Sequence, residues 1–312
     1  MLLSEALLFV AFNVFILLML ALDLGVFHKK AHAVTVKEAI IWSIVWIILA
    51  LLFNVGVFLV AGHAKGLEFL TGYLIERALS FDNIFVFVVI FTYFGVPAQY
   101  QHKALFWGVL GALITRSLFI VVGTALIAKF EWVLYIFGVI LIVSGWKILV
   151  QKGTEVHPEK NVFIRLTRRL FPVTTTYESS RFLVRSSGKL FITPLFLVLV
   201  TIETTDVMFA VDSIPAVFGV TRDPFIVYSS NVFAILGLRA TYFLLAGIMD
   251  TFYYLTYGLS IILIFIGAKM LLETIFPIPT PVSLLVVVGI LTFAVAASLV
   301  RNKRLRQRTT SS

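Results

Sequence analysis

Apolar runs of about twenty residues, separated by short polar segments, follow one another along almost the whole chain. A helix needs roughly 20 apolar residues to cross the hydrocarbon of a bilayer. The pattern predicts nine membrane-spanning helices, at about 5–27, 38–61, 67–95, 103–128, 131–150, 190–219, 224–248, 252–276 and 281–300. These runs lack the strict alternation of apolar and polar residues that is typical of barrel strands. We therefore expect an all-α polytopic membrane protein.

Charge is sparse and is concentrated between the predicted spans. Of the 312 residues, 60% are hydrophobic and 13% are charged, and the net charge is +9. Lysine and arginine gather after the first span, in the connection 151–189 and in the tail after 300. With nine spans and the N-terminus outside, all three segments face the cytoplasm, as the positive-inside rule requires. The basic charge thus indicates topology and gives no reason to expect a nucleic acid partner.

Two stretches of the sequence match each other in their charged residues. Residues 76–83 (ERALSFDN) align with 206–213 (DVMFAVDS), Arg116 then aligns with Arg239, and Lys147 aligns with Lys269. Each copy spans three helices, so the two copies must cross the membrane in opposite directions, as in the inverted repeats of secondary transporters. The predicted organisation is two N-terminal helices (1–66), a first repeat (67–150), a basic cytoplasmic loop (151–189), a second repeat (190–276), and a last helix with a basic tail (277–312).

Carboxylates inside predicted spans are the main chemical signal. A charged side chain near the bilayer centre costs roughly 2.5–3.5 kcal/mol on insertion scales, so a group of them requires compensation, most simply by a bound cation. Oxygen ligands favour Mn²⁺, Mg²⁺ or Ca²⁺ over soft metals. The candidate metal-handling residues are Glu76, Asp82, Asn83, Glu203, Asp206, Asp212 and Ser213, with Asp23 from the first span. Pro215 is expected to break its helix near Asp212 and to free backbone carbonyls for the ion.

Other residue types limit the chemistry. The chain has no cysteine, and its five histidines fall in loops or at span ends, which argues against a soft-metal site and against a redox dithiol. Without an imidazole in the membrane to act as a base for Ser213, an intramembrane enzyme is disfavoured, so we expect no enzyme activity. No permanent cofactor is expected either, because the cation is interpreted as cargo.

Basic residues within the spans have two interpretations. Arg116 and Arg239 either serve as counter-charges that pair with the acids when the ion is absent, or form permanent salt bridges between helices. Lys147 and Lys269 lie near span ends, where a long side chain can extend to the interface. The basic segment NVFIRLTRRLF in the loop 151–189 is amphipathic and predicts a helix on the anionic inner surface of the bilayer.

Two longer segments carry a resemblance. YLIERALSFDNIFVF and TIETTDVMFAVDSIPAVFGVTRDPFIVYSSNVFAILGLRA resemble the signature regions of the TerC family, and the chain from about Met19 to about Glu273 is similar to its Alx-like branch. The resemblance implies a bacterial inner-membrane protein related to the lysine-exporter superfamily, whose members are linked to manganese export, alkaline-pH response and tellurium resistance. By the same resemblance, the metal-handling residues would be Glu76, Asp82, Asn83, Glu203, Asp206 and Asp212, and Asp23 fits the acidic position of the first helix.

Two hypotheses of function remain at this stage. The first is an inner-membrane exporter of a divalent cation, Mn²⁺ above Ca²⁺ or Mg²⁺, that works by alternating access and exchanges the metal for protons. The second is a membrane partner protein that delivers metal to exported enzymes or supports tellurium and alkaline stress resistance without transport of its own. In the second hypothesis the loop 151–189 would dock protein partners.

Overall fold

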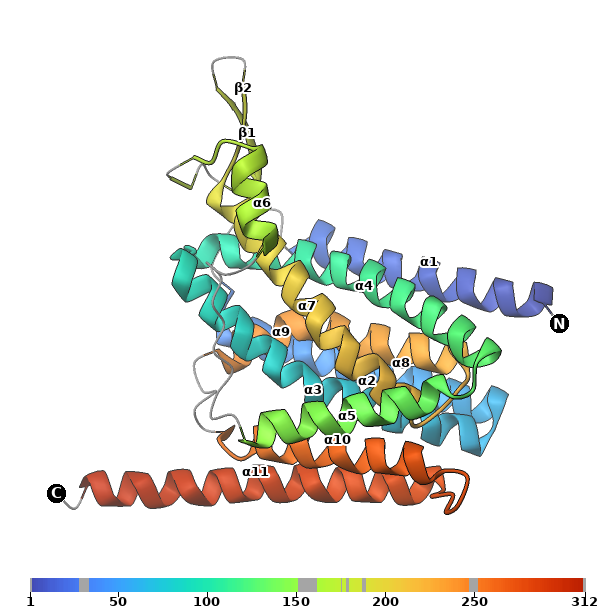
Figure 1. The fold of residues 1–312 in the computed structure, drawn as a ribbon. Helices are drawn as coiled ribbons and strands as arrows, with labels where there is room; N and C mark the ends of the chain where they lie inside the picture. Colours follow the sequence, from blue (N-terminus) through green and yellow to red (C-terminus); the bar gives the residue numbers. More distant parts are fainter. Residues whose placement is uncertain are drawn as a thin grey trace.

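The computed structural model describes residues 2–27, 34–150, 162–174, 176–177, 180–186, 189–246 and 252–310 of the chain. Long helices lie side by side and form most of the molecule (Figure 1). They are α1 (Leu2–Phe27), α2 (Val36–Ala61), α3 (His63–Phe94), α4 (Ala98–Lys129), α5 (Val133–Val150), α6 (Val162–Leu170), α7 (Pro194–Phe218), α8 (Pro224–Leu236), α9 (Leu238–Leu245), α10 (Leu255–Leu272) and α11 (Thr280–Thr310).

Six helices in the described residues are long and apolar enough to cross a membrane. They are α2, α4, α5, α7, α10 and the Thr280–Lys303 part of α11. α1 contains a shorter apolar segment, Leu7–Ala21. The predicted third span corresponds to α3, which contains Glu76, Arg77 and Asp82 along its length. The protein is therefore a multi-pass helical membrane protein, and the number nine stays a prediction.

The helix break lies in a different place from the one that the sequence predicted. α7 runs without interruption through Asp212 and Pro215, so the expected break near Asp212 is wrong. Pro215 lies one turn before the end of α7, where little helix follows the lost hydrogen bond. The predicted span 224–248 is instead divided at Gly237 into α8 and α9.

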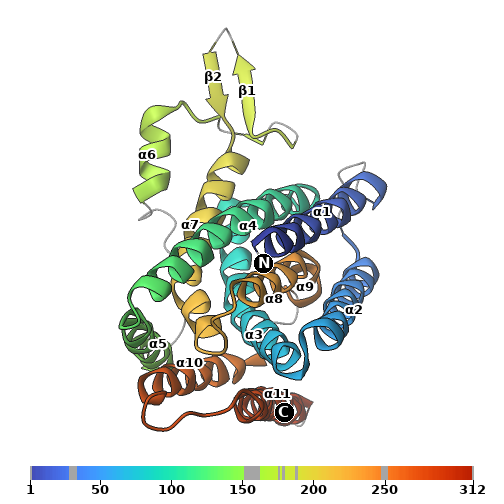
Figure 2. The same ribbon diagram turned by 90° about the vertical axis from the view of Figure 1, so that its right-hand side faces the viewer.

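The predicted loop 151–189 contains ordered elements in its described parts. α6 is the amphipathic helix that NVFIRLTRRLF predicted, and Ile164 packs it against Ile192 and Leu197 at the start of α7. Two strands, β1 (Leu183–Ser186) and β2 (Lys189–Ile192), pair in antiparallel register from Leu183↔Ile192 to Ser186↔Lys189. The hairpin corrects the all-α prediction locally, and it moves the start of the predicted span 190–219 to Pro194. Figures 1 and 2 show α6 and the hairpin projecting from the bundle.

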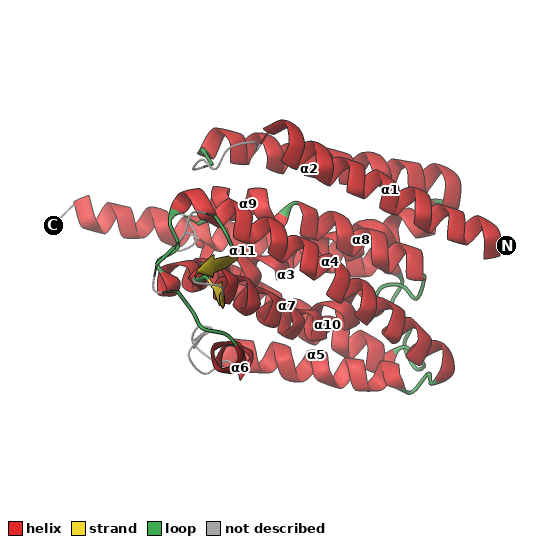
Figure 3. Ribbon diagram, turned by 90° about the horizontal axis from the view of Figure 1, so that it is seen from above, coloured by secondary structure: helices red, strands yellow, loops and turns green. Residues whose placement is uncertain are grey.

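Helices of the two predicted repeats lie against each other inside the bundle. α3 contacts α7, α4 contacts α8, and α5 packs closely along α10 (Figure 3). At the last contact Gly138 faces Gly267, and a Cβ added to Gly267 would lie 2.6 Å from the Gly138 carbonyl oxygen. Two glycines thus allow the backbones to approach closely. The inverted relation of the repeats stays a prediction.

Candidate functional site

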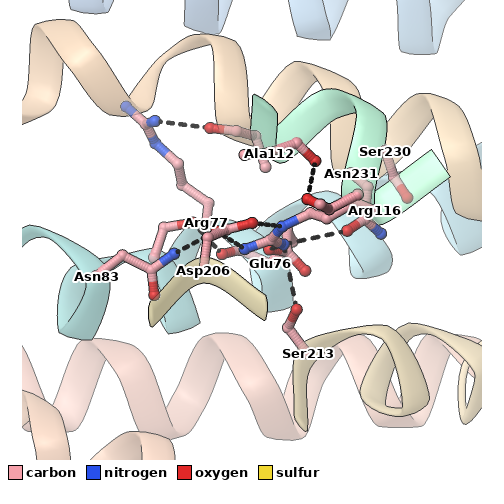
Figure 4. Close-up of polar contacts among 12 residues, drawn as sticks. Glu76, Arg77, Asn83, Ala112, Arg116, Asp206, Ser213, Ser230 and Asn231 are labelled. Carbon is pink, nitrogen blue, oxygen red and sulfur yellow. Dashed lines mark hydrogen bonds and ion pairs between the residues drawn. The ribbon is translucent and has the colours of Figure 1, made fainter. Parts of the chain in front are cut away.

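A buried arginine connects the two acidic helices. Arg116 extends from the middle of α4 between α3 and α7, and only 2% of its surface is exposed. Its Nη1 forms an ion pair with Glu76 of α3, and its Nη2 lies 3.0 Å from Oδ1 of Asp206 on α7 (Figure 4). Nε donates to Oδ2 of Asp206 at 3.3 Å, so this pair is bidentate. Two-point contacts hold the planar guanidinium in a defined orientation.

Neutral groups complete the surroundings of the guanidinium. Nη1 also donates to Ser213 Oγ at 3.1 Å and to Asn231 Oδ1 at 3.4 Å. Asn83 donates weakly, at 3.5 Å, to Asp206 Oδ1. One guanidinium therefore faces two buried carboxylates, which leaves one excess negative charge when both are ionised. The second oxygen of Glu76, Oε2, is buried and has no hydrogen-bond partner among the described residues.

A cavity of about 230 Å³ lies beside this ion cluster. Asp82 of α3 and Asp212 of α7 both line it, although they are far apart in the sequence. Ser144 of α5 donates a 2.6 Å hydrogen bond to Asp212 Oδ1. The residues around the cavity with polar side chains are Glu76, Asp82, Asn83, Arg116, Ser144, Lys147, Asp212, Ser213 and Thr256.

The structure does not bring all the predicted acids together. Glu203 is half-buried outside the cavity wall, and its carboxylate lies directly against Gly111 of α4. Asp23 is on α1, but its side chain falls outside the described part of the structure. In the described residues no three His, Asp or Glu side chains lie close enough to hold a metal ion together. The predicted ligands are thus divided between the Arg116 cluster, the cavity wall and Glu203.

The three membrane arginines have different roles in packing. Arg116 pairs with two acids, which agrees with both interpretations given for it from the sequence. Arg239 is buried with its guanidinium 5.8 Å above the Phe106 ring, a cation–π arrangement. Arg77 reaches the break between α8 and α9, where Nη1 donates to the Ala234 carbonyl at 3.2 Å and Nη2 donates to Thr241. It thus satisfies a carbonyl that the helix break leaves free.

Nothing in the sequence indicated that two residues of α5, Ser144 and Lys147, lie in the cavity wall. Ser144 carries no signal in an apolar segment. Lys147 was expected to extend to the interface; its side chain is exposed, and it also lines the cavity and interacts electrostatically with Asp212. The Gly-x-Lys repeat is the signal that marked Lys147, and its position in the wall required the packing of α5 against α7 and α10.

The model of the family described as "Integral membrane protein TerC family" matches residues 61–306, which include both acidic helices. The chain belongs to the TerC family. It is 49% identical over 296 residues to the membrane protein STKORF319 of Myxococcus xanthus, covering 95% of this chain and 93% of that protein. It is 46% identical over 308 residues to the "Putative membrane-bound redox modulator Alx" of Salmonella typhi, covering 95% and 96%. The protein of the same name from Escherichia coli K12 is 48% identical over 289 residues, covering 90% of each chain.

No solved structure matches this TerC protein. The matches to Alx proteins extend over nearly the whole chain and confirm the Alx-like branch that the two signature segments indicated.

Proposed function

We propose that this TerC protein is a transporter of a hard divalent cation, Mn²⁺ first of all, and that it exports the ion across the bacterial inner membrane by alternating access. The observation that carries the proposal is the cavity that Asp82 and Asp212 line from two different helices, next to the Arg116 cluster. Intramembrane carboxylates facing a cavity are typical of ion pathways.

The chemistry of the cavity suits a hard cation. Two carboxylates of the wall match the charge of a divalent ion, and Asn83 and Ser213 add neutral oxygen atoms. The unpartnered Oε2 of Glu76 adds negative charge from the cluster side. Lys147, in the same wall, supplies the opposing charge.

The dispersed acids favour transport over storage. A site with three or four carboxylates in direct contact would hold the ion tightly, whereas conduction requires an ion that can also leave. The cavity has room for an ion that keeps several water molecules. The same carboxylates can bind protons after the metal has left, which makes proton exchange the natural coupling.

Flux measurements test the proposal. The purified protein is placed in liposomes that contain an Mn²⁺-sensitive dye, and Mn²⁺, Ca²⁺, Mg²⁺ and Zn²⁺ are compared with and without a pH gradient. We expect Mn²⁺ influx that a proton gradient accelerates. If the liposomes with intact protein admit no divalent ion, the membrane partner protein of the second hypothesis replaces the transporter.

The name of the Alx relatives refers to redox modulation, which the residues of this chain do not supply by thiol chemistry. The sequence contains no cysteine, so no dithiol can form within it. A change in the cellular supply of a redox-active metal is a route by which a cation transporter would alter redox balance. In this proposal the N-terminus is outside and the basic segments are cytoplasmic.

A further inference from the structure

A second and larger cavity, of about 750 Å³, lies between α10 and α11. It shares no lining residue with the acidic cavity, because Thr256 and Leu263 of α10 face the acidic cavity whereas Tyr257 and Ile261 face the second one. Figure 2 shows α11 at the edge of the bundle, where it packs against both α10 and α3. We name this cavity the α10–α11 groove.

One end of the groove is aromatic and cationic. The guanidinium carbon of Arg301 lies 3.9 Å above the ring of Tyr253, and the hydroxyls of Tyr253 and Tyr257 are 3.4 Å apart. The backbone N–H of Tyr254 donates to Ser298 Oγ at 3.0 Å, which attaches this end of α10 to α11. No carboxylate among the described residues forms an ion pair with Arg301. One face of the guanidinium is thus covered, and its edge carries N–H donors.

The rest of the groove is apolar and continues along the helices. Ile261, Ile290 and Phe293 form its walls, and Ala296 and Ala297 leave the space open. From Ile290 to Arg301 a helix rises about 16 Å at 1.5 Å per residue. One leaflet of the bilayer is about 15 Å of hydrocarbon. The groove therefore has the length of a single acyl chain.

We propose that the α10–α11 groove binds an anionic phospholipid. The acyl chain lies along Ile261, Ile290 and Phe293, and the phosphate contacts the edge of Arg301 and the hydroxyl of Tyr257. Arginine binds phosphate through paired charge-assisted hydrogen bonds, and tyrosine favours the interface, where one end of the ring is wet. Basic pockets between membrane helices bind anionic head groups in this manner. The apolar helices on both sides make lipid the surrounding medium of the groove.

The proposal is tested with full-length protein in detergent, by native mass spectrometry of lipid retained from phosphatidylglycerol and phosphatidylcholine. Wild-type protein should retain more phosphatidylglycerol than phosphatidylcholine. Arg301→Gln should lower its affinity about tenfold, the loss expected for a hydrogen-bonded charged contact, and should leave phosphatidylcholine unchanged. Ala297→Phe, which fills the groove, should lower the retention of both lipids. Lys303→Gln removes an exposed charge of the same helix and should change neither.

Three outcomes would overturn the lipid site. Equal retention of the two lipids by wild type would mean that Arg301 does not select a head group. Competition by glycerol phosphate as effective as that of the whole lipid would show a site for free phosphate. A dimer that Ala297→Phe dissociates, with no lipid retained, would show that a second copy of the chain covers the groove. Arg301→Lys keeps a charge, so retained selectivity in this variant supports the proposal if Arg301→Gln fails to fold.

Discussion

Asp82 and Asp212 are the two carboxylates of the cavity wall that form no ion pair with an arginine among the described residues. Glu76 lines the cavity as well, but Glu76 and Asp206 are already neutralised in part by Arg116. An incoming cation therefore meets carboxylates without an arginine partner at Asp82 and Asp212. A hydroxyl from Ser144 is the one hydrogen-bond donor that the described side chains give to Asp212. The transport proposal depends on these two carboxylates.

We expect Asp82→Asn and Asp212→Asn each to abolish Mn²⁺ flux in liposomes and to leave membrane insertion intact. The amide has nearly the shape of the carboxylate but lacks the charge that compensates the metal. Flux is measured with the dye assay, and insertion is checked by extraction and gel filtration. Glu131→Gln, at the exposed turn before α5, is the matched control. Full flux in both neutral variants would remove the acidic cavity from the mechanism.

Removal of the Lys147 charge should strengthen the binding of Mn²⁺, whereas removal of the carboxylates should abolish transport. Its ammonium interacts with Asp212 and so opposes a cation in the same cavity. Lys147→Gln should lower the KM for Mn²⁺ severalfold, because removal of a nearby positive charge strengthens cation binding. Lys129→Gln, which removes an exposed lysine over the Phe130 ring, should leave KM unchanged. An unchanged KM for Lys147→Gln would favour the sequence-based expectation that this side chain only extends to the interface.

At the scale of helices, the lengths of the apolar runs were sufficient to predict most helices but did not show where a helix is interrupted. Pro215 marked a break by its chemistry, yet it lies in the last turn of α7, where a missing hydrogen bond has little effect. The actual break, at Gly237, depends on Arg77 from α3, which donates to the carbonyl of Ala234. This contact joins residues 157 positions apart, so local sequence does not reveal it.

The break gives a stability prediction. A Cβ on Gly237 would lie 2.5 Å from Nη1 of Arg77, so Gly237→Ala should displace the guanidinium and leave the Ala234 carbonyl without its donor. The cost of such an unsatisfied buried group is about 1–3 kcal/mol. It should appear as a lower unfolding midpoint in detergent. Gly289→Ala in α11 is the control, because a Cβ there meets nothing within 4 Å. Equal midpoints for the two variants would contradict the role given to Arg77.

The sequence predicted most of the charged residues that belong to the candidate site, but not how these residues are arranged in space. Charged residues in apolar runs marked Glu76, Asp82, Asp206 and Asp212, because their cost in a bilayer requires a reason. Their division into an Arg116 cluster and a cavity wall depends on how α4 packs on α7 so that the Arg116 side chain reaches both α3 and α7, which hydropathy does not encode. Glu203 shows the same limit, since its place against Gly111 follows from the packing of α4 on α7.

At the scale of the whole molecule, the two ends of the helix bundle differ. At one end, Lys65 Nζ lies 2.9 Å from Glu68 and 3.2 Å from Asp223, and Thr221 donates to Glu68, so α3 is tied to the connection between α7 and α8. An Arg222–Glu273 pair at 3.2 Å ties the same connection to the end of α10. The acidic cavity extends toward the opposite end, where Lys147 and Ile148 close α5 and Thr256 begins α10.

Alternating access requires a conformation in which the cavity is open to one face of the membrane and closed to the other, and the two ends of the bundle differ in this way. Because the chain contains no cysteine, single-cysteine labelling can measure this difference. Ile148→Cys in the cavity wall should react quickly with a hydrophilic thiol reagent in detergent, and Mn²⁺ should protect it. Val220→Cys, at a buried position in the connection between α7 and α8, should react slowly at rest. In membranes loaded with Mn²⁺ under a proton gradient, its reaction should accelerate as the Lys65–Asp223 pair opens. Thr274→Cys, exposed at the same end, controls for reagent access. A Val220→Cys rate that stays constant while Mn²⁺ is transported would show that the ion leaves without this end opening, and alternating access would have to be abandoned for a fixed pathway.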